Sequence, residues 1–256
     1  MFTPKTYYAG AGRAVNGCAI DAAATGRLNG RRPYRKPSMS GPDQHQSAET
    51  SSYHHGNLRE ALLQEAILCI RREGVENLSL RALARNIGVS QTAPYRHFTD
   101  KNALLAELAT QAFNELADST AALIRPQQSA AANMQLAGEA YLRYALQNPE
   151  KYRLMFGSAI VQRDQYPALV QAGNRGFSIL LQLIEQGISS GEFIAHSPLL
   201  LANACWSNIH GFALLSIDDL FARRPLPASI DIMLQRQIQF TLRSLQQQPQ
   251  PLPGLN

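Results

Sequence analysis

Apolar residues recur at steps of three and four positions through most of the chain after residue 57, and this spacing predicts a series of amphipathic helices. Glycine, proline and asparagine fall between the periodic segments, where helices commonly end and begin. The expected helices cover residues 57–73, 80–87, 91–97, 101–124, 129–147, 150–156, 165–190, 198–218 and 230–245. Neither the alternation typical of a β-strand nor an internal repeat accompanies this pattern. The sequence therefore predicts an all-α protein with nine helices.

The segment LSLRALARNIGVSQTAPYRHF, which begins at Leu78, is the most informative part of the chain. Its first half places four apolar residues on one helix face: Leu80, Leu83, Ala84 and Ile87. Ser79 precedes them and can accept a hydrogen bond from a free backbone N–H. Gly88 follows them and can adopt the left-handed conformation that ends a helix.

A second short helix is expected after this glycine turn, over residues 91–97, with Ser90 as its N-cap. Pro94 falls inside this helix and should distort it without breaking it. Phe98 closes the segment as a buried apolar side chain. Two short helices joined by a glycine turn have the layout of a helix-turn-helix, whose second helix enters the major groove of DNA. The pattern alone does not require this function, because any small helical pair can show it.

The four expected parts of the chain are a disordered leader, a DNA-binding domain, a ligand-binding and dimerisation domain, and a disordered tail. They cover residues 1–50, 54–114, 115–247 and 248–256, respectively. The leader lacks periodicity, and Met39 is a plausible true start of translation; the alternative is a basic arm that attracts phosphates. Seven Lys or Arg stand against three acids in the leader, six against five in residues 51–100, and eleven against eleven in the remainder. Bulk charge therefore does not establish nucleic-acid binding.

The three cysteines lie far apart and suggest neither a disulfide framework nor a metal site. No apolar run approaches the length of a membrane span, and no secretory signal pattern opens the chain. We therefore expect a cytoplasmic protein without membrane association. The adjacent pair His54-His55 does not match a metal-binding motif, and the sequence predicts no metal and no cofactor. Motifs for a catalytic serine or a dinucleotide are also missing, so an enzyme is not expected.

Three strings, YHHGNLREALLQEA, EGVENLSLRALARNIGVSQTAPYRHF and DKNALLAELA, resemble the TetR/AcrR family of transcriptional regulators. The string YLRYALQNPEKYRLMFG and the pattern Trp206-x-x-x-His210-Gly211 resemble a subgroup with a Trp-x-x-x-His-Gly C-terminal domain. The resemblance covers about residues 53–246. It implies a homodimer with an N-terminal three-helix DNA-binding domain and a C-terminal helical bundle that binds an effector and the partner subunit.

The resemblance also implies roles for individual residues in DNA binding. Gln91 and Thr92 would reach base edges, where glutamine can pair with adenine and a threonine methyl can contact thymine. Further expected contacts, mostly to phosphates, are Ser90, Tyr95, Arg96, His97, Lys101, Arg81, Tyr53, His54 and Asn57. The alternatives are solvated side chains for Arg81 and Arg96, and packing against the first helix for Tyr95.

In the C-terminal half, aromatic and other large residues are candidates for an effector pocket. They are Tyr141, Tyr144, Tyr152, Met155, Phe156, Phe177, Trp206 and His210. For His210 the alternative is an ordinary core histidine. Helix 198–218 is apolar on all sides and should be buried on both faces. Together with the last helix it would form the dimer contact, through Leu201, Cys205, Ile209, Phe212, Leu234, Ile238 and Leu242.

These features favour a ligand-responsive repressor that binds a near-palindromic double-stranded operator as a homodimer. The two recognition helices would lie about 34–36 Å apart, and an apolar or aromatic effector would favour a state with the wrong spacing. Alternatives are an activator of the same fold, a ligand-binding or enzymatic protein that has lost DNA binding, and a non-specific architectural DNA-binding protein. The residues do not identify the effector or the operator sequence.

Overall fold

The computed structural model describes residues 58–223 and 228–246. All of these described residues lie in one compact unit of the chain. The secondary structure of these described residues is helical and contains no strand, as the sequence predicted.

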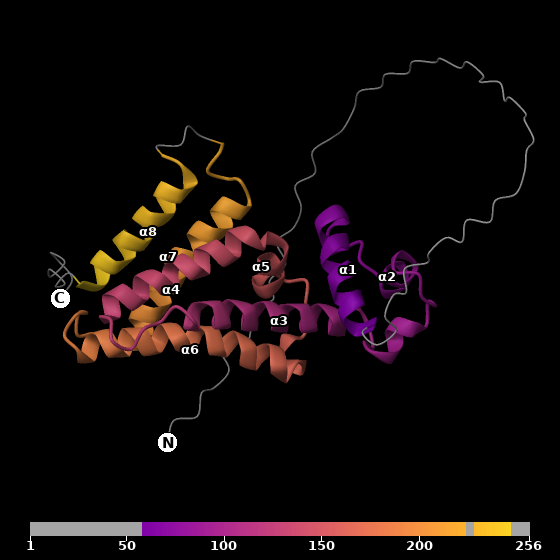
Figure 1. Ribbon diagram of the computed structural model, residues 1–256, viewed down its shortest axis with the longest axis horizontal. Helices are drawn as coiled ribbons and strands as arrows, with labels where there is room; N and C mark the ends of the chain where they lie inside the picture. Colours follow the sequence, from indigo (N-terminus) through magenta and orange to yellow (C-terminus); the bar gives the residue numbers. More distant parts are fainter. Residues whose placement is uncertain (1–57, 224–227, 247–256) are drawn as a thin grey trace, which may run out of the picture. The chain divides into compact units, whose positions relative to one another are not determined.

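The described residues form eight α-helices and two short 3-10 helices (Figure 1). The first group contains α1 (Leu58–Glu73), α2 (Leu80–Asn86), the 3-10 helix η1 (Ala93–Arg96) and α3 (Lys101–Ala121). The second contains α4 (Ala130–Gln147), α5 (Pro149–Phe156), the 3-10 helix η2 (Arg163–Gln165), α6 (Pro167–Ser189), α7 (Pro198–Ile217) and α8 (Ile230–Gln246).

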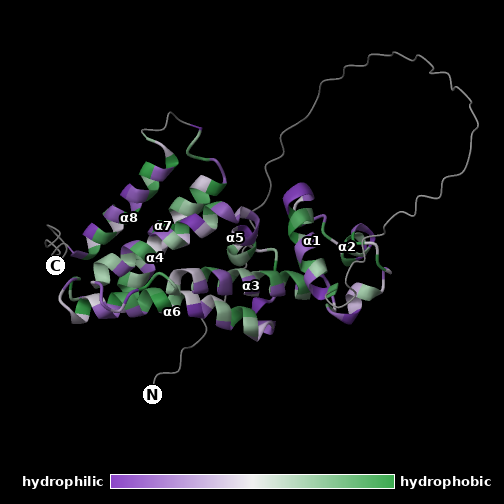
Figure 2. Ribbon diagram, viewed as in Figure 1, coloured by the Kyte–Doolittle hydropathy of each residue, from purple (hydrophilic) through white to green (hydrophobic). Residues whose placement is uncertain are grey.

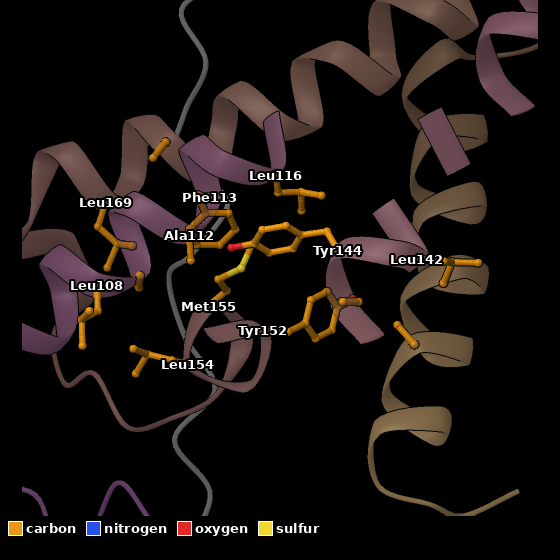
Figure 3. Close-up of a cluster of buried hydrophobic side chains, with 14 of the residues drawn as sticks. Leu108, Ala112, Phe113, Leu116, Leu142, Tyr144, Tyr152, Leu154, Met155 and Leu169 are labelled. Carbon is orange, nitrogen blue, oxygen red and sulfur yellow. The ribbon is translucent and has the colours of Figure 1, made fainter. Parts of the chain in front are cut away.

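Helix α3 joins the N-terminal helices to the C-terminal bundle. It lies along α6, and α4 and α5 pack against it as well (Figure 1). Figure 3 shows Phe113 of α3, Tyr144 of α4 and Met155 of α5 gathered in one core. Each such side chain, when fully buried, contributes roughly 1.5–3 kcal/mol. The boundary that we expect near residue 114 falls inside α3, so both proposed domains share this helix.

Three polar side chains cap the helices that follow them, and Ser79 does so at the position that the sequence predicted. Ser79 accepts from the amide of Ala82 at 3.2 Å, Asp100 from Ala103 at 2.8 Å, and Ser129 from Ala132 at 3.1 Å. Each bond satisfies a backbone donor that the helix itself leaves unpaired. The glycines expected to end helices have positive φ angles: 82° at Gly74, 73° at Gly88 and 76° at Gly191. Local sequence therefore determines most of the helix boundaries.

The second helix of the expected helix-turn-helix differs from the prediction. In place of an α-helix over 91–97, the structure has η1, a 3-10 helix of four residues. Pro94 has no amide N–H to contribute, and its carbonyl oxygen accepts from the amides of His97 (2.9 Å) and Phe98 (3.0 Å). Eight of the nine expected helices are α-helices in the described residues, and the remaining one is present as η1.

The N-terminus of α4 is also capped from a distant part of the chain. The two carboxylate oxygens of Glu192 accept hydrogen bonds from the amides of Ala130 (2.9 Å) and Ala131 (3.0 Å). The bonds from Ala131 and then Ala130 are the main causes that lower the pKa of Glu192 below its ordinary value. A carboxylate with a lowered folded-state pKa stabilises the fold above its unfolded pKa, and this stabilisation is lost as the pH falls through the folded pKa.

Replacing Glu192 with glutamine is therefore expected to lower the free energy of unfolding at pH 7 by about 0.5–2 kcal/mol, as for the loss of other caps. The deficit should begin to shrink below pH 4.5, the ordinary pKa, where the unfolded chain takes up a proton, and it should disappear as the pH falls through the lowered pKa of the folded carboxylate. Urea unfolding at pH 7 and at pH 3 measures both effects, with Glu185→Gln on α6 as the control. An equal deficit at both pH values would contradict a role for the charge.

Candidate DNA interface and sensing core

The helices α1, α2 and η1 form a small unit, here called the reading unit. Helix α1 packs against α2 and η1, and Leu62 and Leu83 are fully buried between them. Pro94 and Phe98 are buried on the inner side of η1, and the Arg59 guanidinium lies 5.6 Å from the Phe98 ring centroid. The apolar side of η1 therefore faces inward, and its polar side faces solvent.

The polar residues expected to contact DNA share the outer surface of the reading unit. Those on α2, on η1 and between them are all exposed: Arg81, Ser90, Gln91, Thr92, Tyr95, Arg96 and His97. Tyr95 is 48% exposed, so its hydroxyl group is accessible to a phosphate. Arg85 is exposed as well, one helical turn after Arg81, and the sequence analysis missed it although the spacing is visible there. Tyr53, His54 and Asn57 lie outside the described residues.

Three of the expected contact residues are engaged within the protein. Nζ of Lys101 donates to the carbonyl oxygen of Glu76 at 3.0 Å, which fastens the start of α3 to the turn after α1. An ammonium group has three protons, so Lys101 can still donate to a phosphate. The Ser90 hydroxyl lies 3.3 Å from that of Thr92, and neither side chain caps η1. The expected Ser90 cap was therefore wrong.

A carboxylate fixes α1 to α2 on the other side of the reading unit. Oε1 of Glu65 accepts from Asn86 at 2.8 Å, from Arg72 at 2.9 Å and from Cys69 at 3.3 Å. Burial raises the pKa of Glu65, but these hydrogen bonds outweigh it and lower the pKa overall. The charged carboxylate thus holds the last residue of α2 in place.

Four of the effector candidates form a hydrogen-bonded row, here called the sensing core. Nε1 of Trp206 donates to the hydroxyl oxygen of Tyr141 at 3.2 Å. The hydroxyls of Tyr141 and Tyr152 lie 2.8 Å apart, and that of Tyr152 lies 2.6 Å from Nδ1 of His210. An indole N–H can only donate, so Tyr141 accepts from Trp206, whereas the bonds from Tyr141 to Tyr152 and from Tyr152 to His210 can run in either direction with the tautomer of His210.

Aromatic rings surround the sensing core. The ring centroid of Phe156 lies 4.5 Å from that of His210 and 6.0 Å from that of Trp206, and Phe177 approaches Trp206 from α6 at 6.2 Å. Tyr152 is completely buried, whereas Trp206 and His210 are half-buried. Burial lowers the pKa of His210 below its ordinary value of 6.5, so the imidazole is neutral at pH 7. The hydrogen-bonded side chains of the sensing core are thus enclosed by aromatic rings.

Two further effector candidates lie apart from this row. The Tyr144 hydroxyl donates to Glu115 at 2.9 Å, and Lys151 binds the same carboxylate at 2.8 Å. Met155 is 1% exposed and lies with Tyr144 in the core that Figure 3 shows. Burial, followed by the charge of Glu115, raises the pKa of Tyr144. Tyr144 and Met155 therefore serve the packing of α3, α4 and α5.

The residues expected to form the dimer contact belong mostly to the chain's own core. Leu201 is half-buried. The other six are buried within the single chain: Cys205, Ile209, Phe212, Leu234, Ile238 and Leu242. Figure 2 shows hydrophobic residues along α7 with hydrophilic ones among them. Because α7 has no single polar face, the sequence alone could not show which face its own chain covers. The uncovered face of α7 instead carries Leu200, Ala204, Ser207, Gly211 and Leu215. We call these five residues the α7 stripe.

The uncovered surface continues onto α8. Phe240 is 61% exposed and Ile232 is 49% exposed, two turns apart on this helix. Asn208 binds both Thr241 and Gln237 of α8, so the two helices are fixed to each other. By length and composition α7 could cross a membrane, and it is the single such helix in the described part of the chain; core helices of soluble proteins pass the same test. Among residues 58–223 and 228–246, no group of three or more His, Cys, Asp or Glu could hold a metal ion.

A helix-turn-helix unit with an exposed polar face, followed by a helical bundle, defines the class of DNA-binding transcriptional regulators. Two family models match the chain: "Bacterial regulatory proteins, tetR family" over residues 62–108, and "Tetracyclin repressor-like, C-terminal domain" over residues 134–241. Together these matches cover more than half of the sequence. The chain belongs to the TetR family and is a DNA-binding transcriptional regulator.

Individual relatives agree with this assignment. The HTH-type transcriptional regulator YobS of Bacillus subtilis is 26% identical, over 66% of this chain and 83% of the relative. A protein of unknown function from Rhodococcus sp. RHA1 has the same fold, with a TM-score of 0.65 and 28% identity over 77% of this chain and 100% of its own. The TetR-family regulator PfmR from Thermus thermophilus also shares the fold, with a TM-score of 0.58 and 21% identity over 73% of this chain and 99% of its own.

Proposed function

We propose that the protein is a ligand-responsive, homodimeric repressor that acts in the cytoplasm on a near-palindromic operator. The observation that carries this proposal is the division of the fold into two sites. One is the exposed row of donors on α2 and η1, with Arg81, Gln91 and Tyr95 as examples. The other is the sensing core, about which the bundle packs. A small apolar or aromatic effector at the second site would change operator affinity at the first.

The exposed donors divide into two roles. Phosphate oxygens accept hydrogen bonds from charged or neutral donors, and these contacts do not depend on the DNA sequence. The side chains suited to this role are Arg81 and Arg85 on α2, and Tyr95 and His97 around η1. Gln91 suits a base edge, since its amide can donate and accept at once. The row has few long cations near η1, so base reading rests chiefly on Gln91 and Thr92.

In the sensing core, the half-buried rings of Trp206 and His210 are the surfaces that an effector would meet. Phe156 and Phe177 flank them and would favour an apolar or aromatic molecule. Helix α7 carries the rings of Trp206 and His210, and it also carries the α7 stripe. We propose that the C-terminal domain is of the Trp-x-x-x-His-Gly type, in which one helix would then serve both effector binding and dimerisation.

The test is a footprint of the purified protein on DNA upstream of its own gene and neighbouring genes. Arg85→Ala should weaken binding to every protected site alike and reduce the salt dependence by about one phosphate contact. Gln91→Ala should change the preferred sequence, at a cost of about 1–3 kcal/mol at the base that it reads.

The matched control is Arg143→Ala, which removes an exposed arginine of α4. It should leave both the affinity and the salt dependence unchanged. Protection of no fragment at low ionic strength would exclude the regulator proposed here. An unchanged sequence preference in Gln91→Ala would exclude that residue as a base contact. Protection that persists in excess random competitor DNA indicates an operator-binding protein, whereas protection that is lost indicates a non-specific architectural one.

A further inference from the structure

One side chain fastens the segment between α5 and α6 to the first turn of α3. Nδ2 of Asn102 donates to the carbonyl oxygen of Val161 at 2.8 Å, and Oδ1 of Asn102 accepts from the amide of Val161 at 2.9 Å. The same Nδ2 donates to the hydroxyl of Tyr166 at 2.9 Å. Asn102 therefore pairs with Val161 as one peptide group pairs with another, and it also holds the residue that precedes α6.

The segment that Asn102 holds is strained. Gln162 has φ 52° and ψ 53°, a left-handed conformation that residues other than glycine rarely adopt. Such conformations persist where the surroundings fix them. Ile160 is buried, but the side chain of Val161 is 64% exposed and contributes little packing. The three hydrogen bonds of Asn102 thus constrain the residue before the strained one, and the carbonyl oxygen of Gln162 itself accepts from the amide of Gln165 at 2.9 Å.

Both ends of α5 are connected to the N-terminal part of the chain. At its start, Glu150 forms an ion pair with Arg71 of α1, with N and O atoms 3.2 Å apart. Beyond its end, Arg163 donates to the carbonyl oxygen of Met155 at 2.7 Å, which ties the segment held by Asn102 back to α5. Helix α5 also carries Tyr152 of the sensing core. A displacement of α5 is therefore passed to α1 and to the start of α3.

We propose that Asn102 is the residue that couples the sensing core to the reading unit, through its bonds to Val161 and Tyr166. This inference rests on the proposed function, since it assigns a regulatory role within the same protein. Removal of the Asn102 side chain would free the strained segment from α3. The exposed ion pair between Arg71 and Glu150 would then be the remaining polar link from α5 to the reading unit, and because exposed ion pairs contribute little, most of the response to α5 would be lost.

The test uses an operator duplex identified by footprinting and needs no effector, because coupling between two sites is reciprocal. Two signals are recorded with and without the duplex: hydrogen exchange of the amides in residues 157–166, and the fluorescence of Trp206, the single tryptophan of the chain. In the native protein the duplex should slow exchange at least about fivefold, the lower end of typical couplings, and should change the Trp206 emission. In Asn102→Ala most of both responses should be lost while the duplex still binds.

The control is Asn114→Ala on the same helix, which removes a long 3.5 Å contact to Arg175 and leaves the segment untouched. It should respond as the native protein does. If Asn102→Ala does not fold, Asn102→Asp serves in its place, because it keeps the acceptor for the Val161 amide and loses both donated bonds. A native response in the Asn102 variant, or no response in the native protein with the duplex bound, overturns the coupling role alone. Failure of the native protein to bind any duplex removes the proposed function and this inference together.

Discussion

Replacement of Gly211 with leucine is expected to convert the proposed dimer into folded monomers. Gly211 lies in the middle of the α7 stripe, and a Cβ atom added there meets no atom of its own chain within 4 Å. Within one chain the change is therefore harmless, and leucine raises helix propensity by up to about 1 kcal/mol. Across a close helix–helix contact, however, the larger side chain would hold the two subunits apart.

The loss of the dimer should also remove most of the operator affinity. Two linked reading units can gain about 10²–10⁴-fold over one through their effective concentration. Sedimentation analysis gives the oligomeric state, and a titration with labelled operator gives the affinity. A thermal melt shows that the monomer is folded.

A second pair of variants tests the location of the dimer contact with matched side chains. Leu215 on the α7 stripe is 41% exposed, and Leu123 beyond the end of α3 is 39% exposed. Leu215→Glu should dissociate the dimer, whereas Leu123→Glu should not. A Gly211→Leu protein that stays dimeric at micromolar concentration would show that another surface joins the subunits.

The second large effect is expected at Gly187 of α6. The ring of Phe193, which is 4% exposed, occupies the space that a Cβ atom at Gly187 would need. Gly187→Ala should therefore lower the free energy of unfolding by about 1–3 kcal/mol, as other overpacked cores do. This loss should outweigh the gain in helix propensity. Urea unfolding measures the difference.

Gly176 on the same helix provides the matched comparison, because an added Cβ there meets nothing within 4 Å. Gly176→Ala should raise the stability by up to about 1 kcal/mol, from helix propensity alone. Equal effects of the two alanines would show that the Phe193 ring moves aside without cost.

The sequence predicted the helices well where their ends depend on neighbouring residues. Ser79, Asp100 and Ser129 cap the helices that follow them because a cap acts over three residues, within reach of a local pattern. It failed at Pro94, where the local rule allowed either a distorted α-helix or a 3-10 turn.

The candidate site was harder to predict, because its contacts join distant parts of the chain. The shared face of Trp206 and His210 follows from their spacing, but the position of Tyr152 beside them does not. Tyr144 looked equivalent to Tyr141 and instead binds Glu115. On α7 both faces are apolar, so periodicity could not distinguish the covered face from the α7 stripe. Asn102 was missed because its partners lie 59 and 64 residues away.

The direction of the hydrogen bonds in the sensing core has a chemical consequence. If Nδ1 of His210 accepts the proton of Tyr152, the neutral imidazole must carry its own proton on Nε2. A molecule that arrives at this outer edge of the ring meets an N–H group. Carbonyl and ether oxygens can accept a hydrogen bond from this group, whereas a protonated amine, which can only donate, cannot. The hydrogen bond from Tyr152 would in this way set the tautomer of His210 and, through it, the class of effector that the histidine binds.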